Sequence, residues 1–415
     1  MSEILIGPFR QLLTMRDLPL KGALKDSQLE VIEQGGLWIE NGKVKATGNF
    51  EVLRSQAGDT VGVRLITEDK VCLPSFVDCH THIAFGGNRA NDFAMRNAGS
   101  SYLEIAQAGG GIWSTVKHTR EATQEELKEL TKRRAAYLLE QGITTVEVKS
   151  GYGLNKEEEL KTLRAVKHAN AELEIDLVPT CLAAHMKPKD FEGTAKEYLA
   201  LMATDLFPVL QEEKLTDRID AFIEQTAFSA EDIQDYFKKA KEMGFMITVH
   251  ADQFSTSGSA VAVAFDAVSA DHLEASTDAE IALLADSDVV AVALPAASLG
   301  IGCAFTPARR LLDAGASLAI ATDWNPGSAP MGQLIASASI LATMEKLSNA
   351  EVLAAVTFRA AQALNLSDRG RLVEGQLADF IIYDTNNYQN ITYLQGALQP
   401  SAVWKNGVAV RSNLK

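Results

Sequence analysis

The sequence predicts an α/β protein in which a (β/α)₈ TIM barrel carries a small composite β-sandwich domain from both termini. Three observations support this prediction. The middle of the chain alternates short apolar runs with helical patterns, five of its seven histidines follow such runs, and both ends carry hairpin signals. We expect the β domain to comprise residues 1–74 and 370–415, and the catalytic barrel to comprise residues 75–369.

The two ends share one turn signal. Asn41-Gly42 lies between alternating residues in LWIENGKVKATG, and Asn406-Gly407 lies in AVWKNGVAV after the strand-like ADFIIYD. An Asn-Gly pair between alternating residues is typical of a two-residue type I′ hairpin. Two β-rich ends around a different middle favour one shared domain over two separate β appendages.

Eight apolar runs in the middle predict the strands of the barrel. They are, in order, KVCLPSFVDCH, ITTVEVKS, IDLVPTCLAAH, RIDAFIEQ, FMITVHA, DAVSADH, VVAVALP and SLAIATD. Helical patterns at 156–168, 196–210 and 232–243 lie between such runs, and eight strands within about 250 residues match a (β/α)₈ barrel. An open doubly wound sheet is the alternative, but no GxGxxG follows the first strand. About sixty residues separate the first two strands, and we expect them to fold over the barrel mouth.

Composition excludes several classes of protein. Hydrophobic residues make up 47% of the 415 residues and charged residues 22%, which excludes a disordered chain. The net charge of −15 argues against nucleic-acid or anionic-membrane partners. No signal peptide is recognisable, and Pro295 interrupts the longest uncharged stretch. Four scattered cysteines (Cys72, Cys79, Cys181 and Cys303) predict reduced thiols in a cytoplasmic protein.

Polar residues gather where the predicted strands end. They are Asp78, His80, His82, Lys149, His185, Glu224, His250, His272 and Asp323. Because active sites of such barrels form at the carboxyl ends of the strands, five histidines on that rim indicate a functional site. His118 and His168 lie in helical patterns, and we expect them at the surface. Asp78 and Glu224 are predicted to have supporting or structural roles.

His80-Thr81-His82 is the strongest metal signal. Residues i and i+2 of a strand face the same side, so both imidazoles can reach one ion. With His250 and Asp323 the set becomes three imidazoles and one carboxylate, which suits one divalent or trivalent transition metal, Zn or Fe, better than Ca²⁺ or Mg²⁺. An open position would hold a water whose pKa Zn²⁺ lowers to about 7. A closed structural site is the alternative, but it leaves His185 and His272 unused.

Other motifs indicate less. Gly109-Gly110-Gly111 lacks the following Lys-Ser or Lys-Thr of a phosphate loop, and no GxSxG occurs. Lys149 could be imagined as a carbamylated metal bridge, but no second metal cluster accompanies it. A positioning contact or a structural ion pair is the better interpretation.

These motifs resemble known enzymes. VDCHTH, His250, His272 and Asp323 resemble the amidohydrolase superfamily of metal-dependent hydrolases. Within it, YLEIAQAGGGI, VKSGYGL, AAHMKP and TDWNPGSAP resemble the imidazolonepropionase family over nearly the whole chain. The resemblance implies hydrolysis of the cyclic amide of 4-imidazolone-5-propanoate to N-formimidoyl-L-glutamate, the third step of histidine degradation. It also implies a homodimer.

The resemblance assigns roles to individual residues. The implied metal ligands are His80, His82, His250 and Asp323; the implied substrate-binding residues are Arg89, Tyr102, Tyr152, His185, Gln253, Asn325, Gly327 and Ser328. His272 and Asp323 are expected to move protons, and His185 is expected to stabilise the oxyanion together with the metal.

One position departs from the family pattern. Many relatives carry Glu where this chain has Gln253, so a general-base role there is in doubt. The same position argues against the main alternative, a purine or pyrimidine deaminase with HxxE after strand five. The alternative from another class is a non-catalytic metal-binding protein.

Overall fold

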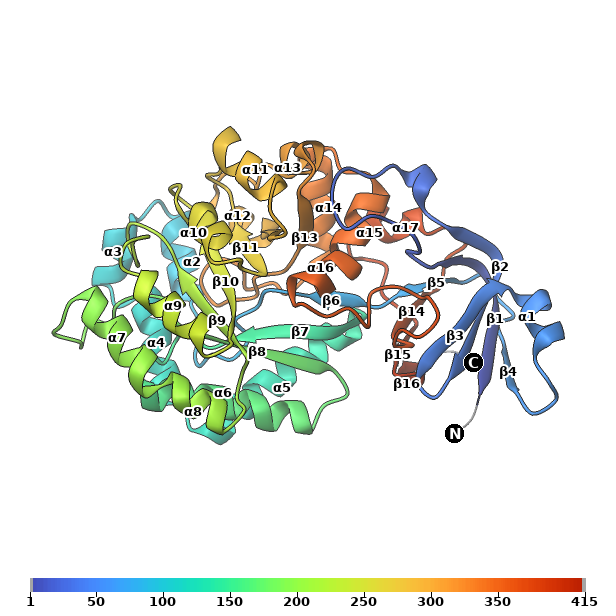
Figure 1. The fold of residues 1–415 in the computed structure, drawn as a ribbon, viewed down its shortest axis with the longest axis horizontal. Coiled ribbons are helices and arrows are strands. Elements are labelled where there is room, and N and C mark those ends of the chain that lie inside the picture. The colour runs from blue at the N-terminus through green and yellow to red at the C-terminus, as the bar shows by residue number, and fades with distance from the viewer. Residues whose placement is uncertain (1–2, 413–415) are drawn as a thin grey trace.

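A computed structural model describes residues 3–412, apart from the side chains of Tyr102, Leu103 and Ala106. It confirms the predicted barrel: eight parallel strands lie beside one another in chain order (Figure 1). They are β6 (Phe76–Asp78), β7 (Ile143–Lys149), β8 (Asp176–Ala184), β9 (Arg218–Phe222), β10 (Met246–Ala251), β11 (Ser269–His272), β12 (Val290–Ala293) and β13 (Ser317–Ile320).

The barrel is nearly closed between its first and last strands. Beyond their carboxyl ends, the backbone N–H of His82 donates to the carbonyl of Trp324 over 3.0 Å. The N–H of Asp323 donates to the carbonyl of His80 over 3.0 Å. These bonds bring the HxH segment and Asp323 together, although more than two hundred residues separate them in the chain.

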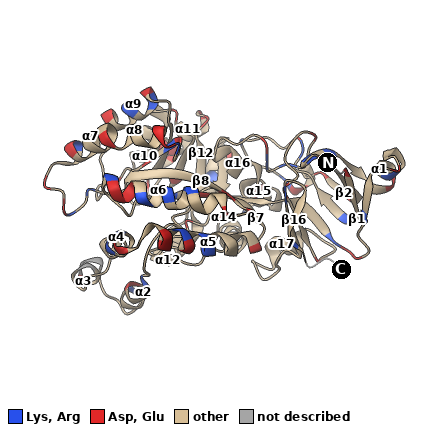
Figure 2. Cartoon of the chain, turned by 90° about the horizontal axis from the view of Figure 1, so that it is seen from below, with Lys and Arg blue, Asp and Glu red and all other residues tan. Residues whose placement is uncertain are grey.

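Helices surround the strands, and several begin with a capping box such as Thr123 with Glu126 (Figure 1). They are α2 (Ala90–Asn97), α3 (Tyr102–Gln107), α4 (Ile112–Glu121), α5 (Gln124–Glu140), α6 (Lys156–Ala171), α7 (Ala195–Asp205), α8 (Phe207–Glu212), α9 (Gln234–Glu242), α10 (Gly258–Ala264), α11 (Asp278–Ala285), α12 (Pro295–Ile301), α13 (Ala308–Ala314), α14 (Leu334–Glu345), α15 (Asn349–Ala355), α16 (Phe358–Ala363) and α17 (Gln389–Tyr393). Charged residues colour outer helices such as α5, α6, α7 and α9, whereas the strands are mainly uncharged (Figure 2).

Both ends of the chain build one mixed sheet at the far end of the molecule (Figure 1). Its strands are β1 (Ile4–Leu13), β2 (Val31–Glu40), β3 (Lys43–Asn49), β4 (Gly62–Leu65), β5 (Val71–Pro74), β14 (Phe380–Tyr383), β15 (Ala402–Lys405) and β16 (Val408–Ser412). Its order is β3-β2-β1-β5-β14-β15-β16, with β4 paired to β1. Side chains from both ends, such as Phe9 and Trp404, share one hydrophobic cluster.

The two Asn-Gly pairs form the turns that their sequence predicts. Asn41 has φ 55° and Gly42 φ 78°, between β2 and β3. Asn406 has φ 50° and Gly407 φ 73°, between β15 and β16. Positive φ at both central residues is the requirement of a type I′ turn. A short helix, α1 (Phe50–Gln56), packs Phe50 and Leu53 against Leu5 and Trp38.

Two predicted elements prove to be divided. The first apolar run contains two strands: β5 ends at Pro74 in the mixed sheet, and β6 begins at Phe76 in the barrel. The helical pattern over 196–210 contains α7 and α8, which meet at Leu206, two residues before Pro208. Proline provides no N–H and is favoured in the first turn of a new helix. Within residues 3–412, no helix is both long and apolar enough to cross a membrane.

Candidate active site

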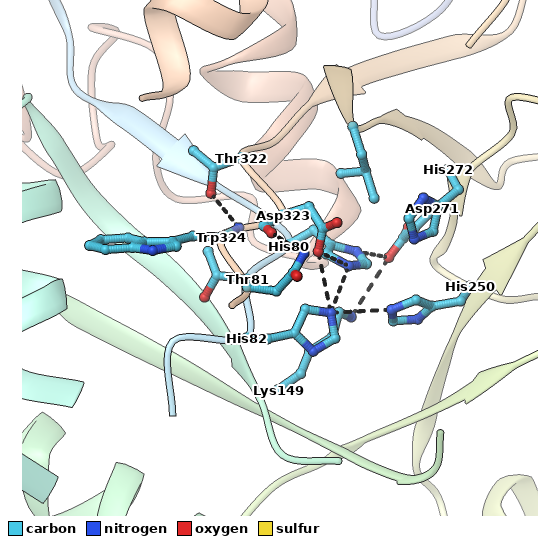
Figure 3. A network of polar contacts seen from close by, with 12 residues as sticks. His80, Thr81, His82, Lys149, His250, Asp271, His272, Thr322, Asp323 and Trp324 are labelled. Atoms are coloured by element: carbon cyan, nitrogen blue, oxygen red, sulfur yellow. Dashed lines mark hydrogen bonds and ion pairs between the residues drawn. The ribbon is translucent and has the colours of Figure 1, made fainter. Parts of the chain in front are cut away.

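Three histidine side chains converge at the carboxyl end of the barrel (Figure 3). His80 Nε2 lies 3.3 Å from His82 Nε2, which lies 3.3 Å from His250 Nε2. All three side chains are buried. Nitrogen ligands about 2.05 Å from a tetrahedral metal ion would lie about 3.3 Å from one another. The spacing of the cluster therefore fits a single metal ion.

The protonation of two of these rings supports the same conclusion. His80 Nδ1 donates to Asp271 Oδ2 over 2.6 Å, and His250 Nδ1 lies 2.9 Å from Asp220 Oδ2. In a neutral ring, a hydrogen on Nδ1 leaves a lone pair on Nε2. The Nε2 lone pairs of His80 and His250 would therefore repel each other unless a cation lay between them. Burial lowers the pKa of His80 and His82, and lowers that of His250 to about 3, so the rings are neutral as metal ligands must be.

Asp323 completes this cluster from the turn after β13. Its Oδ1 lies 3.5 Å from His80 Nε2 and 3.4 Å from His82 Nε2, and it has no hydrogen-bond partner among the described residues. The residue has φ 48°, a conformation that L residues rarely adopt and that often marks a functional position. Asp78 supports the turn by accepting from the backbone N–H and the hydroxyl of Thr322.

A buried lysine connects the carboxylates behind two of the histidines. Lys149 Nζ lies 2.8 Å from Asp220 Oδ2, 2.8 Å from Glu147 Oε1 and 3.7 Å from Asp271 Oδ2. Burial alone would lower the pKa of Lys149. The three carboxylates raise it by more than burial lowers it, so the net pKa is raised and the lysine remains charged. Lys149 therefore makes the structural ion pairs that its position predicts. Sequence analysis missed Asp220 and Asp271, because a lone Asp inside a strand resembles any other polar residue.

His272 lies beside the cluster without joining it. Its ring centroid is 5.4 Å from that of His250 and 5.8 Å from that of His80. Its Nδ1 lies 3.5 Å from Glu274 Oε2, and Glu274 accepts a hydrogen bond from Ser298. Burial lowers the pKa of His272, but Glu274 and then Asp323 outweigh this effect and raise it. The ring is thus placed beside the cluster with a carboxylate partner that favours its protonated form, as a group that exchanges protons requires.

His185 presents an acceptor to the cavity. Its Nδ1 lies 2.9 Å from the carbonyl oxygen of Gly151, and since a carbonyl can only accept, this nitrogen carries the hydrogen. Burial lowers the pKa of His185 to about 4, so the ring is neutral near pH 7 and its Nε2 bears a lone pair. The predicted role in stabilising an oxyanion requires a donor, which this neutral ring does not offer there.

The cluster opens into a cavity of about 810 Å³. Apart from His80 and Tyr102, the predicted site residues all line it: His82, Arg89, Tyr152, His185, Gln253, His250, His272, Asp323, Asn325, Gly327 and Ser328. His80 lies behind the wall, and the side chain of Tyr102 lies outside the described part of the structure. Lining residues that sequence analysis did not select include Arg96, Ile112, Met186, Phe222, Gln225, Phe254, Ser255 and Ile301.

Two loops of the cavity wall are held by internal hydrogen bonds. Asn325 Nδ2 donates to Asp323 O and Ser328 Oγ, while its Oδ1 accepts from the N–H groups of Gly327 and Ser328. Its side chain is fully used within its own turn. Glu224 likewise accepts from the N–H groups of Phe254 and Ser255, which fixes the loop after Gln253. Glu224 therefore has the structural role that we expected.

Comparisons with known proteins agree with this architecture. A family model described as "Amidohydrolase family" matches residues 93–411. The chain is 40% identical over 413 residues to the imidazolonepropionase of Bacillus mycoides (strain KBAB4), covering 98% of this chain and 96% of that protein. It is equally similar, with the same coverage, to the imidazolonepropionase of Bacillus cereus (strain ZK / E33L).

Solved structures share the fold at lower identity. An adenosine deaminase from Xanthomonas campestris with bound zinc superposes with a TM-score of 0.72 at 19% identity, covering 99% of this chain and 93% of that one. An atrazine chlorohydrolase from Arthrobacter aurescens TC1 complexed with zinc superposes with a TM-score of 0.69 at 16% identity, covering 100% and 96%. At such identities the likeness concerns the fold alone.

Proposed function

Because the chain belongs to the amidohydrolase family, we propose that its cavity hydrolyses the cyclic amide C–N bond of 4-imidazolone-5-propanoate to give N-formimidoyl-L-glutamate, the third step of histidine degradation. The observation that carries the proposal is the 40% identity, over nearly the whole chain, to relatives named imidazolonepropionase. The geometry is consistent with it, since His82 and His250 of the histidine cluster line one cavity together with Arg89.

His80, His82, His250 and Asp323 would hold one divalent metal ion, either Zn²⁺ or Fe²⁺. When bound, such an ion would act as a Lewis acid, which polarises a carbonyl group and makes water more acidic. Asp271 and Asp220 keep the Nε2 lone pairs of His80 and His250 directed at the ion.

The remaining steps belong to groups of the chain. The water that attacks the ring carbonyl carbon gives its proton to His272, either directly or by way of Asp323. As the bond between that carbon and the ring nitrogen breaks, His272 returns a proton to the nitrogen, which leaves as a neutral group. Glu274 stabilises the charged form of His272 between these two transfers. His185 accepts a hydrogen bond from a ring N–H and so orients the imidazolone plane.

Gln253 argues against deamination as the activity. Deaminases with HxxE use the glutamate to carry a proton to the ring nitrogen, and the amide of Gln253 cannot ionise. Its side chain lines the cavity, where it can still hydrogen-bond the substrate ring.

Two measurements on one purified sample test the proposal. We expect elemental analysis to find about one Zn or Fe per chain. We also expect the absorbance of freshly made imidazolone propionate to fall when the protein is added, and to fall no faster than in buffer after metal removal. Deamination of adenosine or cytosine without loss of imidazolone would refute the proposal. Bound metal with no turnover of any cyclic amide would favour a non-catalytic protein.

Three further proposals have different grounds: the scattered cysteines support the location, the resemblance supports the dimer, and the hairpins at both ends support the domain bounds. The enzyme acts in the cytoplasm as a homodimer, and residues 1–74 with 370–415 form a β domain distinct from the barrel at 75–369. Light scattering on the eluted protein tests the dimer. Limited proteolysis tests the domains, since cuts should concentrate near residues 75 and 370.

A further inference from the structure

Two arginines of one helix meet at one point of the cavity wall. Arg89 precedes the first residue of α2, and Arg96 lies in its last turn. Arg96 Nη2 lies 3.5 Å from the carbonyl oxygen of Gly327. A Cβ atom placed on Gly327 would lie 2.5 Å from Arg89 Nη1, so the missing side chain leaves room for that guanidinium. Both arginines line the cavity.

The charges at this point do not balance. Asp92 Oδ2 lies 2.7 Å from Arg89 Nε and also accepts from the N–H of Gly111. Among residues 3–412, Arg96 pairs with no carboxylate; its other contact is the ring of Phe93, 5.8 Å away. The two arginines and Asp92 together therefore carry one net positive charge, on a chain whose total is −15. A half-buried guanidinium without a counter-ion at a cavity wall favours an anionic ligand.

Arg89 and Arg96 lie where they could bind the charged end of a substrate whose reacting carbon lies at its other end. Gly327 lies four residues after Asp323, at the other end of the turn that Asn325 holds rigid. A ring placed at the histidine cluster can therefore extend its tail along this turn toward the arginines. Glu224, an acidic residue elsewhere on the wall, is already bonded to Phe254 and Ser255.

We propose that Arg96 binds the propionate carboxylate of the substrate together with Arg89, forming a two-guanidinium subsite that makes the site specific for cyclic amides with an anionic tail. This proposal rests on the proposed function. Arg89 supplies its Nη atoms, because its Nε is engaged by Asp92. Arg96 supplies the uncompensated charge.

The test compares Arg96→Met with a matched control, Arg133→Met, which removes an exposed arginine of α5 away from the cavity. The probe is imidazole-4-propionate, which has the ring and the tail but lacks the scissile carbonyl. Its primary amide lacks only the charge. Dissociation constants of both compounds are measured by calorimetry on each metal-loaded variant, together with kcat and KM for imidazolone propionate.

We expect Arg96→Met to weaken binding of the acid about 10- to 100-fold, to leave binding of the amide within about twofold, and to raise KM more than it lowers kcat. Arg133→Met should change none of these. Equal weakening for acid and amide would overturn the proposal, as would unchanged binding of the acid. If the unaltered enzyme binds the acid better than the amide but does not hydrolyse imidazolone propionate, the proposed function fails while the subsite stands.

Discussion

Lys149 Nζ and Asp220 Oδ2 lie 2.8 Å apart in the interior of the barrel, and neither side chain is exposed to solvent. The same carboxylate oxygen lies 2.9 Å from His250 Nδ1. Lys149 therefore acts on the imidazole of His250 through Asp220. Lys149 also lies 3.7 Å from Asp271, which holds His80 (Figure 3). One cation thus orients two of the histidines.

We therefore expect Lys149→Met to weaken metal binding about 10- to 100-fold, as loss of groups that orient metal ligands commonly does. Competition with a chelator measures the affinity. Lys70→Met is the matched control, because Lys70 is also a buried lysine and pairs with Glu68 and Asp384, but it directly precedes β5 of the mixed sheet, outside the barrel. Loss of stability in both variants, with unchanged metal affinity in both, would contradict the positioning role.

Removing one ligand should have a larger effect. His250→Ala takes away a neutral imidazole from the cluster and leaves Asp220 without its histidine partner. We expect bound metal well below one ion per chain and almost no turnover. Elemental analysis and the absorbance assay measure the two quantities on the same sample. Full metal content with a near-native rate would show that His250 is not a ligand.

His272→Ala separates proton transfer from metal binding. Because His272 lies outside the three-histidine cluster, we expect the variant to keep its metal. Its rate should nevertheless fall roughly 10²- to 10⁴-fold, the usual effect of losing a general acid–base group. Metal content and kcat are compared with those of the unaltered enzyme. A variant that loses its metal would place His272 among the ligands.

How much of this site the sequence predicts depends on how each residue is positioned. His80, His82, His250 and His272 could be predicted, because parallel strands end at one rim and each histidine ends or follows an apolar run. Arg96 could not, since its approach to Gly327 depends on how α2 folds back over the barrel.

The supporting carboxylates illustrate a second limit. Asp220 and Asp271 lie inside strands β9 and β11, and their roles follow from cross-strand neighbours that the local pattern does not specify. The division of the first apolar run into β5 and β6 was missed for a related reason. Pro74 and Ser75 interrupt a run whose apolar character continues on both sides, while its two halves pair with different sheets.

The state of His185 gives a prediction on pH dependence. Burial lowers its pKa to about 4, so the charged form is disfavoured and the ring stays neutral as pH rises above about 5. We expect no inflection from His185 in the profile of kcat/KM between pH 6 and 9. His185→Gln should lower kcat/KM because the lone pair directed at the substrate is displaced, but its acidic limb should coincide with that of the unaltered enzyme. An acidic limb that disappears in the variant would show that His185 titrates in this range.

Arg89 gives the last prediction, which concerns the substrate tail. Its Nη atoms border Gly327 on the cavity wall, while its Nε is held by Asp92. If the guanidinium binds the propionate, Arg89→Met should lower kcat/KM by about 2–4 kcal/mol in transition-state free energy, because the charged hydrogen bonds from Arg89 are lost and Arg96 alone is left to balance the carboxylate. An imidazolone without the propionate should be a slow substrate of the unaltered enzyme, and the mutation should change its rate little.

The same variant also strands Asp92, whose carboxylate would keep only the N–H of Gly111 as a partner. The double variant Arg89→Met with Asp92→Asn controls for this effect, since an amide at position 92 is neutral and needs no counter-ion. We expect the double variant to discriminate between the two substrates as weakly as the single variant does. If the single variant loses equal activity toward both substrates, and the double variant regains it for both, then Arg89 serves to neutralise Asp92 and not to bind the tail.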